Sequence, residues 1–273
     1  MAYAWLDGAI VPEGEARIPI RDRGFVYGDG CFETVRIHRG APFRLQAHFA
    51  RLRQSLDLLR IESPASMEDL QYGARKLVAA NRIEDGLVRF TITAGRRLAV
   101  TGSAVITTRG LPSVPTRGAL HIANAARRLS GPLSQCKSIA RTAESVALRE
   151  AEAQGAFDSI LLNEKGSVAE TTARNLFVVS EGALRTPPTY DGALPGITRA
   201  AVLDLASQEG IGAREASLSV DQLRAADEVF LTGSGVGVLA IASVDGHRYP
   251  ETGPITDRIR DRYGRLIDTE PKW

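Results

Sequence analysis

The chain has 273 residues, of which 44% are hydrophobic and 24% charged, and this is long enough to bury a substantial core. A disordered tail, a collagen-like fibre and a disulfide scaffold are excluded, because glycine follows no three-residue period and only Cys31 and Cys136 are present. The net charge of +2 gives no reason to expect nucleic acid as a partner. No apolar run approaches the roughly 18 residues of a membrane span and no basic leader precedes one, so we expect a cytoplasmic protein.

Lysine is scarce in this chain. It occurs at four positions, and the other thirty cations are arginines. A reaction that needs a lysine therefore has four candidates. Lys76 stands beside an arginine on a predicted helix, Lys165 lies in a hydrophilic turn, and Lys272 is next to last, so these three are interpreted as solvated. Lys137 is, on position alone, as consistent with a surface residue as with a functional one.

The first half of the chain predicts helices between strands. A leucine or phenylalanine occupies every third or fourth position from Leu45 to Leu59, which is the spacing of an amphipathic helix with one stripe in a core. β-branched and aromatic residues predict the strands. The expected elements are a strand at 32–37, helices at 45–61 and 67–80, and strands at 86–93 and 103–108.

A break in the pattern follows. Residues 109–118 hold two prolines and two glycines, which neither a helix nor a central strand accommodates. We therefore expect a small N-terminal α/β domain at 1–110, a linker at 111–118 and a larger C-terminal domain at 119–273 that carries Lys137.

The second half mixes the two kinds of element. The pattern predicts a helix at 143–155, strands at 159–162 and 175–179, a helix at 198–210 and a strand at 228–232. Strands and helices do not alternate regularly. An irregular α/β or α+β fold is therefore favoured over a doubly wound sheet or an eightfold barrel.

Two glycine-containing segments are candidates for binding a phosphate. Leu194-Pro-Gly-Ile-Thr-Arg199 begins a predicted helix, where unsatisfied N–H groups and the positive end of the helix dipole attract an anion. Gly233-Ser-Gly-Val-Gly237 follows a predicted strand and offers further N–H groups. Each segment alone is more often a helix cap or a turn. The dinucleotide and Walker patterns are absent, and the four histidines are too scattered for a zinc site, so no metal is expected.

A lysine together with two phosphate-binding segments is what a pyridoxal phosphate (PLP) enzyme requires. The lysine amine forms a Schiff base with the cofactor aldehyde, and the 5′-phosphate needs an anion site. The pyridine nitrogen needs a carboxylate to stay protonated. Glu170 follows a strand-turn segment and is a candidate for that role.

The sequence resembles the class IV aminotransferases, the fold-type IV PLP enzymes that include D-amino acid transaminase, branched-chain aminotransferase and 4-amino-4-deoxychorismate lyase. Six motifs occur in family order over nearly the whole chain. They are Asp22-Arg-Gly24 with Tyr27-Gly-Asp-Gly-Cys-Phe-Glu-Thr-Val-Arg36, His48-Phe-Ala-Arg-Leu52, Cys136-Lys-Ser138, Gly166-Ser-Val-Ala-Glu170 with Asn175-Leu-Phe177, Leu194-Pro-Gly-Ile-Thr-Arg199, and Phe230-Leu-Thr-Gly-Ser234.

The resemblance implies a role for particular residues. Lys137 would form the Schiff base and carry the proton between the substrate Cα and the cofactor, and Glu170 would pair with the pyridinium nitrogen. The phosphate would be held by Arg51, Ile197, Thr198 and Ser234, with Leu194 packed under the ring. The substrate-binding residues implied are Tyr27, Phe32, Arg36, Arg89 and Gly235. The resemblance also implies a cofactor at a domain interface and a homodimer.

The chain departs from the family pattern after the lysine. Many relatives have a tyrosine there that binds the phenolic oxygen of PLP, whereas this chain has Ile139-Ala-Arg-Thr142, which resembles some lyases. The arginine-histidine carboxylate site of one D-amino acid transaminase type is not matched either, because Gly95-Arg-Arg-Leu98 lacks the histidine. Arg89, Arg96 and Arg97 are at least as consistent with surface arginines as with substrate-binding ones.

We therefore predict an aminotransferase that moves an amino group from an amino acid to a 2-oxo acid in a ping-pong cycle, with small molecules as its partners. Among substrates, D-amino acids are slightly favoured. The alternatives are a branched-chain L-amino acid aminotransferase, a 4-amino-4-deoxychorismate lyase and, from a different class, a phosphate-binding protein without PLP chemistry.

Overall fold

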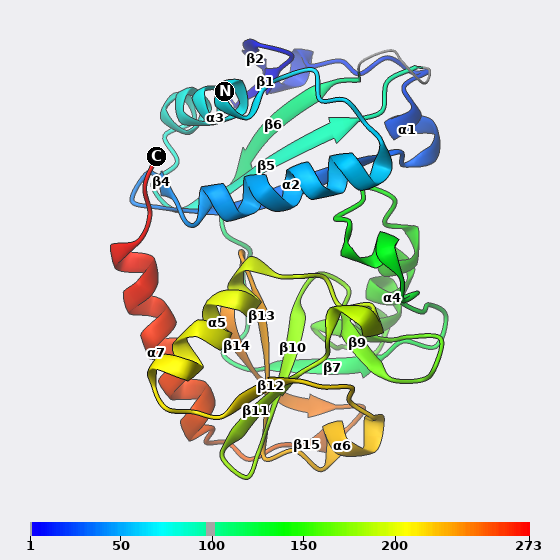
Figure 1. Cartoon of the computed structure of the whole chain (residues 1–273), viewed down its shortest axis with the longest axis vertical. Helices are drawn as coiled ribbons and strands as arrows, with labels where there is room; N and C mark the ends of the chain where they lie inside the picture. The colour runs from blue at the N-terminus through cyan, green and yellow to red at the C-terminus, as the bar shows by residue number, and fades with distance from the viewer. Residues whose placement is uncertain (1, 97–101) are drawn as a thin grey trace. The chain divides into compact units, whose positions relative to one another are not determined.

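The computed structural model describes residues 2–96 and 102–273, and the chain folds into two compact units (Figure 1). Unit 1 comprises Met1–Leu111, Cys136–Arg141 and Ile267–Trp273, and unit 2 comprises Pro112–Gln135 and Thr142–Leu266. Lys137 thus belongs to unit 1, whereas the sequence placed it in the C-terminal domain. The physical reason is that its segment is hydrogen-bonded to a strand of unit 1.

Unit 1 is a sheet with helices packed on it. Its strands are β1 (Tyr3–Leu6), β2 (Ala9–Pro12), β3 (Gly30–His38), β4 (Ala41–Pro42), β5 (Gly86–Thr93) and β6 (Ala104–Arg109). Its helices are α1 (Arg23–Tyr27), α2 (Leu45–Leu59) and α3 (Met67–Ala80). The sheet order is β2-β1-β6-β5-β3-β4, and β3 pairs with β5 antiparallel from Gly30↔Thr93 to Ile37↔Gly86.

The alternation of side chains along β3 decides what each face of this sheet does. Val35 and Ile37 point into a core that includes the predicted stripe of α2, and Phe49 of that stripe meets Phe90 edge-on at 5.3 Å between ring centroids. The other face of β3 carries Phe32, Thr34 and Arg36. The predicted helices at 45–61 and 67–80 are confirmed.

Unit 2 is built around a longer sheet. Its strands are β7 (Gly118–Ile122), β8 (Asp158–Leu162), β9 (Val168–Thr171), β10 (Asn175–Ser180), β11 (Ala183–Thr186), β12 (Ala213–Glu215), β13 (Glu228–Gly233), β14 (Gly237–Val244) and β15 (His247–Arg248). Its helices are α4 (Thr142–Ala153), α5 (Ile197–Gln208), α6 (Val220–Arg224) and most of α7 (Pro254–Thr269).

The sheet of unit 2 mixes parallel and antiparallel pairs in the order β12-β11-β10-β13-β14-β7-β8-β9, with β15 paired to β14. β7 runs parallel to both β8 and β14. In the centre, the opposed residues Phe177 and Phe230 stack at 4.9 Å between ring centroids. The mixed α/β class predicted from the sequence is confirmed.

One short helix was not expected from the sequence. Residues 23–27 form α1, because the side chain of Asp22 accepts a hydrogen bond from the Gly24 N–H at 2.6 Å and Gly28 ends the helix in the left-handed conformation. None of the helices among the described residues combines the length and the apolarity that crossing a bilayer requires.

Gly73 of α3 is expected to be necessary for packing against β1. A Cβ at this position would lie 2.6 Å from Nε1 of the buried Trp5 indole. Gly73→Ala should therefore lower the free energy of unfolding by about 1 kcal/mol, because overpacking outweighs the gain in helix propensity. The matched control is Gly264→Ala in α7, where no atom lies within 4 Å of the added methyl and stability should rise by about 0.5–1 kcal/mol. Urea unfolding of both variants measures this, and equal changes would contradict the prediction.

Candidate active site

The segment around Lys137 lies along the edge of β3. The N–H of Phe32 donates to the Lys137 carbonyl at 2.9 Å, and the N–H of Ile139 donates to the Gly30 carbonyl at 3.1 Å. Cys31 and Ser138 form an antiparallel bridge. Lys137 is thereby fixed to a strand that the folded unit holds in place.

The ring of Phe32 gathers three cations. Lys137 Nζ lies 4.8 Å from the ring centroid, and the guanidinium carbons of Arg89 and Arg141 lie 3.7 and 5.9 Å from it. Burial, together with the positive charges of Arg109 and Arg141, lowers the pKa of Arg89 to about 10. An anion bound here would relieve the repulsion between these cations.

Arg51 of α2 belongs to a buried charged cluster. Its Nε and Nη2 donate to the two carboxylate oxygens of Glu33 at 2.7 and 2.8 Å, and Nδ1 of His48 lies 2.7 Å from Glu33 Oε2. Burial alone would raise the pKa of Glu33, but Arg51 and His48 hold it well below its usual range. Burial lowers the pKa of His48, so its imidazole is neutral at pH 7 and donates a hydrogen bond to the carboxylate.

The other substrate candidates of unit 1 have their described contacts with other groups. Tyr27 is 68% exposed on α1, beneath the guanidinium of Arg23. Arg36 shares a face of β3 with Phe32, but it pairs with Asp85 at 3.4 Å, and its buried Nε has no hydrogen-bond partner among the described residues. Arg97 lies outside the described residues. Phe32, Arg89 and Lys137 are therefore the unit 1 candidates that the structure brings together.

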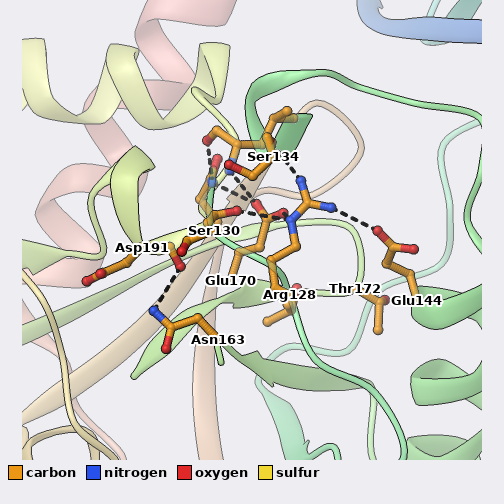
Figure 2. Close-up of polar contacts among 12 residues, drawn as sticks. Arg128, Ser130, Ser134, Glu144, Asn163, Glu170, Thr172 and Asp191 are labelled. Carbon is orange, nitrogen blue, oxygen red and sulfur yellow. Dashed lines mark hydrogen bonds and ion pairs between the residues drawn. The ribbon is translucent and has the colours of Figure 1, made fainter. Parts of the chain in front are cut away.

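Glu170 lies at the centre of a polar cluster in unit 2 (Figure 2). Its carboxylate is buried on β9. Oε2 accepts the main-chain N–H of Leu194 at 3.0 Å and the side-chain amide of Asn175 at 3.2 Å, while Oε1 lies 3.2 Å from Nε of Arg128. A carboxylate held in this way is suited to accept a hydrogen bond from a protonated ring nitrogen.

The N-terminus of α5 is suited to an anion. Gly196 is its N-cap and has no side chain with which to cap the first N–H groups. A Cβ on Gly196 would lie 1.9 Å from Asn175 Oδ1, so glycine is required at this position. Thr198 is buried in the first turn. Thr232 stands opposite Asn175 in the sheet, and its buried Oγ1 has no partner among the residues that the structure describes.

Ser234 and Gly235 lie in the turn between β13 and β14, which is closed by a hydrogen bond of 3.2 Å from the Val236 N–H to the Gly233 carbonyl. Both residues are half-buried. Unit 2 thus combines a buried carboxylate, an uncapped helix start and an unpartnered hydroxyl, and these groups fit the pyridine nitrogen and the phosphate of PLP.

Sequence reasoning overlooked several polar residues of these clusters, namely Glu33, Arg128 and Thr232. A signal for Glu33 did exist, because an acidic residue stands among the core-facing positions of an otherwise apolar strand face. Arg128 gave none, since it is one arginine of thirty and its partners are distant in the sequence.

Comparisons with known proteins define the class. Residues 30–244 match the model of the class IV aminotransferase family. A putative branched-chain-amino-acid aminotransferase of Methanocaldococcus jannaschii is 31% identical over 98% of this chain and 96% of its own length. The crystal structure of the Thermoproteus uzoniensis branched-chain aminotransferase has a TM-score of 0.92 and 30% identity, covering 98% of this chain and 96% of that one. A putative 4-amino-4-deoxychorismate lyase from Legionella pneumophila has a TM-score of 0.84 and 30% identity, covering 93% and 97%.

The chain belongs to the class IV aminotransferases. It is a PLP-dependent transaminase, and its substrates are small molecules, namely amino acids and oxo acids. The relatives named above include no D-amino acid transaminase, so they give no support to the preference for D-amino acids expected from the sequence.

The cluster of Glu33 and His48 should make the stability of unit 1 depend on pH. Both groups have lowered pKa values in the folded state, so the unfolded chain binds more protons as pH falls through the ordinary values of 6.5 and 4.5. The free energy of unfolding should be highest above about pH 6.5 and should decrease as the pH falls below that value. Both tryptophans, Trp5 and Trp273, belong to unit 1, so their fluorescence during urea unfolding reports this. His48→Gln should flatten the dependence between about pH 7 and 5, and an unchanged slope would contradict the assignment.

Proposed function

We propose that this protein is a branched-chain L-amino acid aminotransferase that uses a 2-oxo acid as amino acceptor. The observation that carries the proposal is the similarity to branched-chain enzymes over nearly the whole of both chains, in sequence and in fold. This substrate class replaces the D-amino acids that the sequence slightly favoured.

Each role in holding PLP is assigned to residues whose geometry is suited to it. Lys137 would hold the cofactor covalently through its ε-amino group, and Glu170 would accept a hydrogen bond from the ring nitrogen. The phosphate would be bound by the N–H groups of Ile197 and Thr198, the hydroxyl of Ser234 and the guanidinium of Arg51, and Leu194 would pack against the ring. When bound, PLP supplies an electron-withdrawing ring that stabilises negative charge at the substrate Cα.

Lys137 also moves the proton. With PLP bound, its ε-amino group would take the proton from the substrate Cα as a general base and release it again as a general acid. The hydrogen bonds between its segment and β3 fix the starting point of this flexible side chain. The side chain lies beside the Phe32 ring, which keeps the amine near an apolar surface.

The substrate carboxylate is assigned to Arg89, because this guanidinium stands over the same ring as Lys137 and is crowded by other cations. Phe32 contributes an apolar surface for a branched side chain. Gly235, which has no side chain, leaves room at the turn after β13. Tyr27 and Arg36 are proposed to contribute less, because their contacts lie elsewhere.

A second candidate is the elimination of pyruvate from 4-amino-4-deoxychorismate. Arg141 favours this reaction, because its guanidinium is a second one beside Phe32. Two guanidinium groups could bind the two carboxylates of such a substrate. The putative Legionella lyase shares 30% identity with this chain, the same value as the Thermoproteus uzoniensis branched-chain enzyme. In that reaction Lys137 would assist elimination instead of transfer.

We also propose a homodimer. Ile20, Phe25 and Tyr27 are between 68% and 80% exposed in and before α1, which is a large apolar surface for one short segment. A second copy of the chain would cover it. Light scattering on the purified protein tests this, and a monomer at working concentration would contradict it.

Lys137→Ala should abolish covalent retention of PLP. The native protein should show a near-visible absorption band that borohydride bleaches, and the variant should show none; Lys165→Ala, in an exposed turn, is the control.

Substrate class is then tested on the native protein by adding L-leucine, D-alanine or 4-amino-4-deoxychorismate and measuring loss of the absorption band or release of pyruvate. Loss of the band with L-leucine supports the proposal, whereas pyruvate release from the third compound would favour the lyase.

Arg51→Ala should weaken PLP binding at least about tenfold, because charged hydrogen bonds to the phosphate are lost. Equilibrium dialysis measures the affinity, with Arg53→Ala on the exposed side of α2 as the control. Because the change leaves Glu33 buried without its partner, Arg51→Lys is tested as well, since it keeps the charge. Full PLP affinity in both variants would overturn the assignment.

A further inference from the structure

We propose that Arg128 is a positioning residue for Glu170, whose carboxylate it holds in the orientation that points it at the ring nitrogen of the cofactor. This inference rests on the proposed role of Glu170. It concerns residues of unit 2 alone, where Arg128 and Glu170 are brought together from positions 42 residues apart.

Arg128 is fixed on all sides of its guanidinium (Figure 2). Nη1 donates to Glu144 Oε1 at 3.0 Å, and Nη2 donates to the Ser134 carbonyl at 2.8 Å. Nε donates to the Gly192 carbonyl at 3.0 Å while it lies 3.2 Å from Glu170 Oε1. Partners from several segments therefore hold this cation in one place, unlike a mobile surface arginine.

The backbone is adapted to this arrangement at Gly192. This glycine has φ of +100°, a conformation that side chains rarely adopt, and an added Cβ would lie 3.1 Å from Cγ of Arg128. The conformation turns the Gly192 carbonyl toward Nε. A side chain at this position would be strained by the backbone conformation, and the arginine stem would have to shift by a few tenths of an ångström.

The contacts of Glu170 divide between its two oxygens. Oε2 accepts hydrogen bonds from the neutral N–H groups of Asn175 and Leu194, and Oε1 faces the guanidinium of Arg128. Donors on both oxygens fix the plane of the carboxylate. Without Arg128, only one oxygen would keep the partners described here, and the carboxylate could rotate about that contact.

The charges of the cluster leave a place for one more cation. Arg128 contributes one positive charge, and Glu144 and Glu170 contribute two negative ones, so the three side chains carry a net charge of −1. A protonated pyridine ring would neutralise it. Loss of Arg128 would remove the cation that lies beside both buried carboxylates, and Glu170 would lose the partner of its Oε1.

The experiment compares Arg128→Gln with Arg127→Gln. Arg127 is the matched control, because it lies next in the chain and is exposed, and its described hydrogen bonds go to main-chain carbonyls. Equilibrium dialysis measures the affinity of each variant for PLP and for the analogue in which carbon replaces the ring nitrogen. Arg128→Gln should weaken PLP binding about tenfold and leave analogue binding unchanged, while Arg127→Gln should change neither.

Further variants separate the possible outcomes. Arg128→Lys, which keeps the charge but loses the planar fork, should weaken PLP binding about threefold and not that of the analogue, and it serves if the glutamine variant fails to fold. Equal losses for PLP and the analogue, or no loss, would overturn the inference. Glu170→Gln tests the underlying assignment. If Glu170→Gln leaves PLP affinity unchanged, the proposed role of Glu170 is wrong. If Glu170→Gln weakens PLP binding but Arg128→Gln does not, only the proposed role of Arg128 is wrong.

Discussion

Three buried carboxylates on strands are matched by arginines, and such pairs occur in both units. Glu33 of β3 binds Arg51 through two parallel hydrogen bonds, Asp158 of β8 binds Arg174, and Glu170 of β9 faces Arg128. A buried charge without a partner costs several kcal/mol, so removal of either member of such a pair is strongly destabilising. The planar guanidinium offers donors in a fixed fork that lysine cannot reproduce. The abundance of arginine in this chain therefore has a structural use beyond general solubility.

The same pairs connect structure with chemistry. Arg51 reaches Glu33 from α2, so the residue assigned to the phosphate is oriented by a carboxylate inside the core. In the second pair the roles are reversed, because the arginine, Arg128, orients the carboxylate of Glu170, which is assigned to the ring nitrogen. In both cases the residue that would touch PLP is held by a second residue of opposite charge. Such support fixes the geometry of a site before its ligand arrives.

Much of the fold follows from local patterns in the sequence. The stripe from Leu45 to Leu59 defines α2 almost to the residue, because apolar spacing of three and four depends on the helix alone. The helix α1 was missed because its cap depends on Asp22 and on the short-range geometry of a glycine. The segment of Lys137 was assigned to the C-terminal domain because position in the chain was the only guide. Its hydrogen bonds to β3 join residues more than a hundred positions apart.

The sequence by itself determined the α/β class, the main helices and strands and, through six ordered motifs, the family and its cofactor. These depend on periodicity and on short segments, which are readable along the chain. Only the tertiary structure decided which charges meet. The pairing of Glu170 with Arg128 and the gathering of Lys137, Arg89 and Arg141 around Phe32 arise from strand register and burial. In a chain with thirty arginines, composition cannot distinguish a buried partner from a solvated one, because the distinction rests on the cost of burying charge in three dimensions.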